Sequence, residues 1–140
     1  MSFKYLDHSA DIKFIVHSNS LEGAFSDSIL AVSNIIIDIN SHSKTSKIKE
    51  IILEANNFER LLYELIEEII FIFETEKFIP KKIKEINIKE KNNSKKIKCK
   101  IEMSSIKNKK IKTGIKAMTY HEMKIKKKNK SYIIECVVDI

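Results

Sequence analysis

Residues 56–76, NNFERLLYELIEEIIFIFETE, decide the fold of this 140-residue chain. Their apolar side chains recur at intervals of three and four, the spacing of an α-helix with one broad apolar stripe. The stripe consists of Phe58, Leu61, Leu62, Leu65, Ile66, Ile69, Ile70 and Phe73. Asn56 is the predicted N-cap, and Glu59, three residues later, completes a capping-box-like pair. Because so wide a stripe must be buried, the helix is expected to pack against a sheet or another helix.

The residues before this helix predict two strands, a first helix and a third strand. Apolar and polar residues alternate on both sides of the turn DHSAD at 7–11, which is typical of strands. Ser20 can cap a helix that runs to about Asn34. Residues 38–46 read as a loop, and residues 48–53 as a short apolar strand.

After Pro80, apolar and polar residues alternate in short runs, which are separated by clusters of lysine and asparagine. This pattern predicts antiparallel strands with one face exposed to solvent. The runs centre on residues 83–88, 97–101, 115–118, 123–125 and 132–138. Two helices and about seven strands in this order predict an α+β fold, with antiparallel or mixed sheets packed against the helices. The length fits a single domain spanning residues 1–140.

Several classes of protein are excluded by composition. No run approaches the roughly 20 apolar residues of a membrane span, and the first residues contain no apolar core of a secretory signal. Cys99 and Cys136 match no ligand spacing and are expected to be free thiols in the cytoplasm. Gly23 and Gly114 are the only glycines, so no glycine-rich nucleotide loop can be built.

Lysines are concentrated in one part of the chain. Residues 81–130 hold 19 lysines and 4 acidic residues, whereas the other 90 residues carry a net charge of −8. Such a segment can contact tRNA or another RNA, or an acidic partner. Drift in an AT-rich genome gives the same pattern, since 25 lysines accompany a single arginine. Tyr120 is the only aromatic residue in the segment that could stack on a base, and both interpretations stay open.

Three short segments concentrate polar chemistry: DHSAD at 7–11, TYHE at 119–122 and the final Asp139-Ile140. If Asp11 lies beside the end of the last strand, its carboxylate joins those of Asp139 and the chain terminus. Three such groups repel one another unless a cation compensates, and Ca²⁺ or Mg²⁺ prefers oxygen ligands of this kind. On pattern alone, Asp11 could equally close a turn and Asp139 could be an exposed terminal residue.

The same segments resemble the archease family. DHSADIKF (7–14) resembles the family's DHTADIGI, and LLYELIEEIIFIFETEKF (61–78) resembles its Leu-Tyr-Glu helix ending in FETEGF. IKAMTYHEMKI (115–125) resembles the family's IKAVTYHEM, and VVDI (137–140) resembles its closing FDI. The matches occur in order and span almost the whole chain.

The resemblance implies a non-catalytic accessory protein that activates an RtcB-type RNA ligase in tRNA splicing and RNA repair, by promoting ligase guanylylation and multiple turnover. It also implies a divalent metal held by Asp11, Asp139 and an oxygen of the terminal Ile140. Supporting or partner-contact roles are expected for Asp7, His8, His121 and Glu122.

Two departures from the family pattern affect these expectations. Lys13 replaces the family glycine after DHTADI and is expected to weaken metal affinity. Gly23 stands where the family has an acidic residue at the entry to the first helix, and glycine is a poor helix former.

Two other functions remain as alternatives. The first is a basic RNA-binding module that recruits the ligase's substrate through residues 81–130. The second is a metal-dependent phosphoester hydrolase built on Asp11 and Asp139, which lacks an evident nucleophile or general base. Steep loss of RNA affinity with rising salt would favour the first, and turnover without a partner would favour the second.

Overall fold

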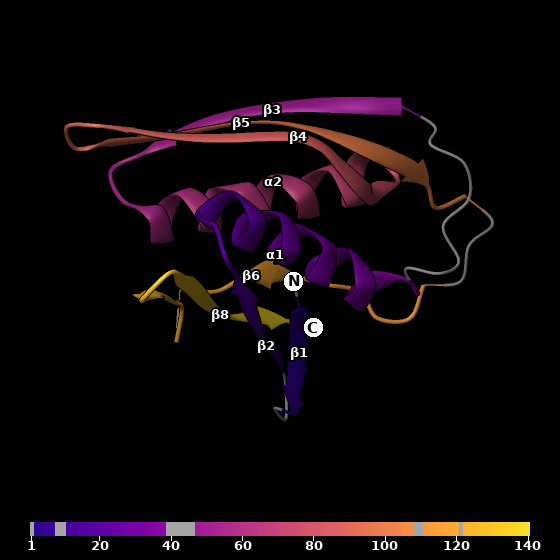
Figure 1. Ribbon diagram of the computed structural model, residues 1–140. Coiled ribbons are helices and arrows are strands. Elements are labelled where there is room, and N and C mark those ends of the chain that lie inside the picture. The colour runs from indigo at the N-terminus through magenta and orange to yellow at the C-terminus, as the bar shows by residue number, and fades with distance from the viewer. Residues whose placement is uncertain (1, 8–10, 39–46, 108–110, 121) are drawn as a thin grey trace.

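The computed structural model describes residues 2–7, 11–38, 47–107, 111–120 and 122–140 (Figure 1). Within this part of the chain, eight strands and two helices follow one another. They are β1 (Ser2–Asp7), β2 (Asp11–Ser18), α1 (Leu21–Ile36), β3 (Lys47–Ala55), α2 (Phe58–Glu76), β4 (Phe78–Lys91), β5 (Ser94–Ser105), β6 (Ala117–Met118), β7 (Lys124–Lys128) and β8 (Ser131–Asp139).

The elements form two antiparallel sheets with both helices between them, as Figure 1 shows. One sheet has the order β3-β5-β4. In the other, β1 pairs with β2 and β2 with β8, while β6 and β7 both pair with the remaining edge of β8. The predicted α+β class with two helices is confirmed, with eight strands in place of about seven.

Helix α2 buries the predicted stripe, because every stripe residue from Leu61 to Phe73 is at most 7% exposed. The predicted N-cap was wrong by one residue. Asn57 caps the helix, and its side-chain oxygen accepts a hydrogen bond of 2.7 Å from the backbone N–H of Arg60. Two adjacent asparagines are chemically equal candidates, and the hydrogen bond selects the second.

Helix α1 begins as predicted. Ser20 caps it by accepting a 3.0 Å hydrogen bond from the N–H of Gly23. The helix ends at Ile36, beyond the predicted Asn34, since Ile35 and Ile36 are both buried in the core. A Cβ atom on Gly23 would lie 2.3 Å from Oγ of Ser18, so this glycine permits a close approach of the helix to the end of β2. Of the predicted loop at 38–46, only Asp38 falls within the described residues.

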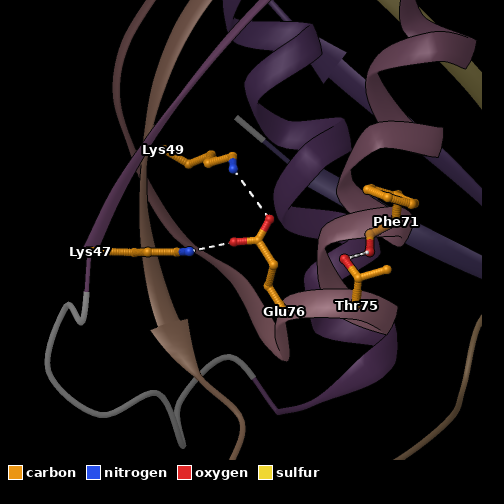
Figure 2. Close-up of polar contacts among 5 residues, drawn as sticks. All are labelled: Lys47, Lys49, Phe71, Thr75 and Glu76. Atoms are coloured by element: carbon orange, nitrogen blue, oxygen red, sulfur yellow. Dashed lines mark hydrogen bonds and ion pairs between the residues drawn. The ribbon is translucent and has the colours of Figure 1, made fainter.

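Strand β3 is longer than the predicted 48–53 and has one exposed face. Ile48 and Ile52 are 49% and 51% exposed, whereas Ile51 between them is buried. On the inner face, Lys47 and Lys49 both donate hydrogen bonds to the carboxylate of Glu76 at the end of α2, the Lys49 bond measuring 3.2 Å (Figure 2). These bonds lower the pKa of Glu76, and they tie the end of α2 to the first strand of the sheet above it.

Strands β4 and β5 form a long hairpin whose register shifts twice, between Pro80 and Lys82 and between Ile83 and Glu85. The shifts explain why the apolar residues of β4 are spaced by three and two rather than strictly by two. Two predicted strands near the end of the chain have other bounds in the structure: β6 contains only residues 117–118 of the predicted 115–118, and β7 runs from Lys124 to Lys128 in place of 123–125.

Candidate metal site

Asp11 and Asp139 lie directly opposite each other in the antiparallel ladder of β2 and β8. Asp11 is the first residue of β2 and Asp139 the last of β8, so the pair sits at one end of the two strands. Directly opposed residues project from the same face, with Cβ atoms about 5 Å apart. The register thus brings together two carboxylates that are 128 positions apart in the sequence.

Ile140 follows this pair and completes the neighbourhood. The carbonyl of Asp139 accepts a 2.8 Å hydrogen bond from the N–H of Lys116, and Asp139 also pairs with Ala117 of β6. The end of β8 is therefore fixed on both edges. Asp11 and Ile140 line one hollow of about 340 Å³, whose other lining residues are Tyr5, Leu6, Ile12, Asn34, Ile35, Lys112 and Thr113.

The donors available here fit a hard divalent cation. In the described parts of the chain, no three His, Cys, Asp or Glu side chains converge as a metal cluster. Side chains thus supply two carboxylates, and further oxygens must come from Ile140 or from water. A ligand set made only of oxygens suits Ca²⁺ or Mg²⁺ and not Zn²⁺, which favours sulfur and nitrogen.

Lys13 is the residue expected to oppose a cation, and the structure shows how its charge is offset. Its Nζ atom lies 3.3 Å from Oε1 of Glu135 and 3.9 Å from Oε1 of Glu122. Lys13 shares a face of β2 with Asp11, because residues two apart in a strand point the same way. Two carboxylates thus neutralise the lysine that stands in place of the family glycine.

The other predicted site residues differ in how they lie relative to the pair of Asp11 and Asp139. Asp7 ends β1 and pairs with Ile12, the residue next to Asp11. Glu122 lies near this region, with Oε1 at 3.9 Å from Nζ of Lys13. His8 and His121 lie outside the described residues, so their roles stay predictions.

Tyr120 and Met118 are fixed to helix α2 by contacts that the sequence did not reveal. The ring of Tyr120 stacks on Tyr63 with centroids 4.6 Å apart and planes inclined by 13°. The guanidinium of Arg60 lies within 6 Å of both ring centroids, and the backbone N–H of Met118 donates a 3.1 Å hydrogen bond to Glu67. One face of Tyr120 is therefore already covered. The available signal was the chain's single arginine, whose planar cation suits aromatic rings better than lysine does.

The two cysteines contribute no nucleophile to the site. Both are buried free thiols, and burial raises the pKa of the Cys99 thiol to about 11. Burial raises the pKa of Cys136 further still. Because the thiolate is the reactive form, neither group is activated at neutral pH.

No helix in the described ranges is both long and apolar enough to cross a membrane.

Comparisons with known proteins give the same family over almost the whole chain. The archease protein family matches residues 3–140. Archease of Sulfolobus acidocaldarius is 36% identical, covering 99% of this chain and 98% of the relative. Archease of Methanosarcina barkeri is 33% identical, covering 99% and 95%.

Two solved structures share the fold. The solution structure of protein 1598 of Methanobacterium thermoautotrophicum superposes with a TM-score of 0.83 at 22% identity, covering 99% of this chain and 98% of that one. A Thermotoga maritima archease described as a possible chaperone gives a TM-score of 0.58 at 21% identity, covering 98% and 96%. The sequence matches carry the assignment, and the superpositions show the shared fold. The chain therefore belongs to the archease family.

Proposed function

We propose that this protein is a non-catalytic accessory factor that activates an RtcB-type RNA ligase in the cytoplasm, using a divalent cation held by Asp11, Asp139 and an oxygen of Ile140. The observation that carries the proposal is the direct pairing of Asp11 with Asp139 at the ends of β2 and β8, with Ile140 adjacent. Family membership supports the choice of a partner protein over an independent substrate.

Each residue has a distinct part in this proposal. Asp11 and Asp139 bind the cation, which supplies positive charge at an exposed end of the sheet. Lys116, the residue before β6, holds the backbone of Asp139 through its hydrogen bond, and Glu135 forms an ion pair with the ammonium of Lys13. With few protein ligands, the site stays open on one side, where an oxygen of the ligase or its nucleotide can approach.

A multiple-turnover ligation assay with the ligase from the same genome tests the proposal. Wild-type protein is expected to raise the number of RNA ends sealed per ligase, and Asp139→Ala is expected to abolish the increase. Glu74→Gln removes an exposed carboxylate of helix α2 and should leave activation intact. Full activation by Asp139→Ala would refute the role of the site.

Direct binding of the cation separates the site from the ligase effect. Calorimetric titration with CaCl₂ and with MgCl₂ should give binding to wild-type protein and to Glu74→Gln, and none to Asp11→Ala or Asp139→Ala. Phosphoester turnover by the protein alone would instead favour a hydrolase.

A further inference from the structure

The lysine-rich segment 81–130 does not form one surface. It passes through both sheets, and its largest group of lysines lies along β4 and β5. The helices pack on only one face of the β3-β5-β4 sheet, and in the part of the chain that the structure describes no element covers the other face (Figure 1). The bare face bears side chains from all three strands.

Two neighbouring hollows on this face share lining residues, and together they form one groove. The first, of about 540 Å³, includes Lys98 and Lys100 in its lining, and the second, of about 670 Å³, includes Lys91. Lys89 and Lys96 line both hollows. Five lysines thus border a continuous groove that leads to the tip of the β4–β5 hairpin.

The five lysines of the groove outnumber its two carboxylates, Glu85 and Glu54, the latter lying opposite Lys96 in the β3–β5 ladder. Lys89 and Lys96 lie directly opposite each other in the β4–β5 ladder, and like charges in this arrangement repel each other and destabilise a sheet. Lys100 has Glu85 as a partner at 3.8 Å, and Glu54 accepts a hydrogen bond from Ser94. Among the described residues, no carboxylate forms an ion pair with Lys89, Lys96 or Lys98.

We propose that this groove, defined by Lys89, Lys91, Lys96, Lys98 and Lys100, binds the sugar-phosphate backbone of single-stranded RNA. Lysines that neutralise phosphates provide affinity without reading sequence. Neutral donors flank them on β4 and at the hairpin tip, namely Asn87, Asn92 and Asn93. They can donate hydrogen bonds to phosphate and sugar oxygens.

The lining also argues against a protein partner and against base recognition. Its only apolar members are Ile86, Cys99 and Ala55, and none is aromatic. Protein interfaces usually centre on aromatic or arginine anchors, and sequence-specific RNA readers stack bases on aromatic rings. The choice of RNA over single-stranded DNA rests on the proposed function.

The test measures fluorescence anisotropy of a labelled 20-nucleotide oligouridine between 50 and 200 mM KCl, with no ligase present. The variant Lys89→Gln/Lys96→Gln/Lys98→Gln is compared with Lys4→Gln/Lys77→Gln/Lys107→Gln, which removes the same charge from exposed lysines outside the groove. We expect the groove variant to lose tenfold or more in affinity at 50 mM KCl. We also expect its salt slope to fall by about two, since each phosphate that a lysine no longer neutralises lowers the slope by roughly 0.7. The control should stay within twofold of wild type.

Equal losses in both variants would overturn the proposal, because net charge alone would then account for binding. Absence of RNA binding by the wild-type protein would also overturn it. Equal binding of a 20-residue polyglutamate would point to an acidic protein instead. Thermal melts of both variants establish that they are folded. If the groove does not bind RNA, the proposed role of Asp139 in ligase activation is unaffected. If the protein does not activate the ligase, a positive RNA-binding result still holds.

Discussion

The ammonium of Lys13 lies between Glu135 at 3.3 Å and Glu122 at 3.9 Å, on the same face of β2 as Asp11. The carboxylates of Glu135 and Glu122 therefore offset the positive charge of Lys13 beside the candidate cation site. Lys13 and Asp11 are two residues apart on a strand, so their Cβ atoms are about 7 Å apart.

Glu135→Gln is expected to weaken cation binding, because it leaves more of the Lys13 charge uncompensated. A unit charge about 7 Å from a divalent ion at the protein surface corresponds to roughly threefold to tenfold in affinity. Titration calorimetry with CaCl₂ measures the change. Lys13→Met/Glu135→Gln removes both charges and should recover the wild-type affinity. If the double variant binds as weakly as Glu135→Gln, Lys13 is not the cause.

Lys77→Gly is expected to stabilise the fold by about 0.5–1 kcal/mol. Lys77 is the C-cap of α2 with φ 61° and ψ 40°, a left-handed conformation that costs a residue with a Cβ atom but not glycine. Urea unfolding followed by circular dichroism measures the gain. Lys77→Ala keeps the Cβ atom and should change stability little, so an equal gain in both variants would implicate the removal of the charge instead.

Gly23→Ala should destabilise the protein, although alanine is the better helix former. The new methyl group would lie 2.3 Å from Oγ of Ser18, which forces a shift of tightly packed atoms costing about 1–3 kcal/mol. Ser18→Ala removes the nearest atom, so Gly23→Ala should cost less in the Ser18→Ala background than in wild type, although Oγ of Ser20, at 2.9 Å, stays close to the new methyl group. Additive effects in this double-mutant cycle would contradict the steric explanation.

Acid should remove the contribution of Glu76 to stability. Hydrogen bonds from Lys47 and Lys49 lower its pKa in the folded state below the usual value near 4.5. The unfolded chain therefore binds the proton first, and the stabilisation is present above pH 4.5 and is lost as pH falls through the folded-state pKa. The difference in unfolding free energy between wild type and Glu76→Gln should shrink between pH 7 and pH 3. A difference that stayed constant over this range would contradict the effect of the two lysines on Glu76.

Local features of the sequence predicted the helices well, because each depends on residues within a few turns. The stripe of α2 and the Ser20 cap of α1 are of this kind. The Asn56 error arose because an adjacent asparagine offers the same hydrogen bond. The irregular spacing of Ile83, Ile86 and Ile88 marked β4 as an imperfect strand, but the positions of the two shifts depend on its pairing with β5 and could not be read from the sequence.

The candidate site was predictable as a set of residues but not in its electrostatics. The approach of Asp11 to Asp139 was a hypothesis from their residue types and from the family resemblance, and the pairing of the second strand with the last strand brings it about. The compensation of Lys13 by Glu135 depends on the register between strands far apart in sequence, as does the stacking of Tyr120 on Tyr63. Such contacts carry no periodic signal, and only the completed sheets bring them together.

The central position of β8 has a consequence for how the protein folds. This strand is the last of the described strands in sequence order, yet it pairs with β2, β6 and β7. The five-stranded sheet cannot assemble until its most distant strands have met, which favours slow folding because closing so long a loop costs entropy before any contact forms. A cation held between Asp11 and Asp139 would bind only the assembled sheet. Added Ca²⁺ or Mg²⁺ would then raise the melting temperature in proportion to the logarithm of its concentration. The melting temperature would therefore measure the stability of the pairing between β2 and β8.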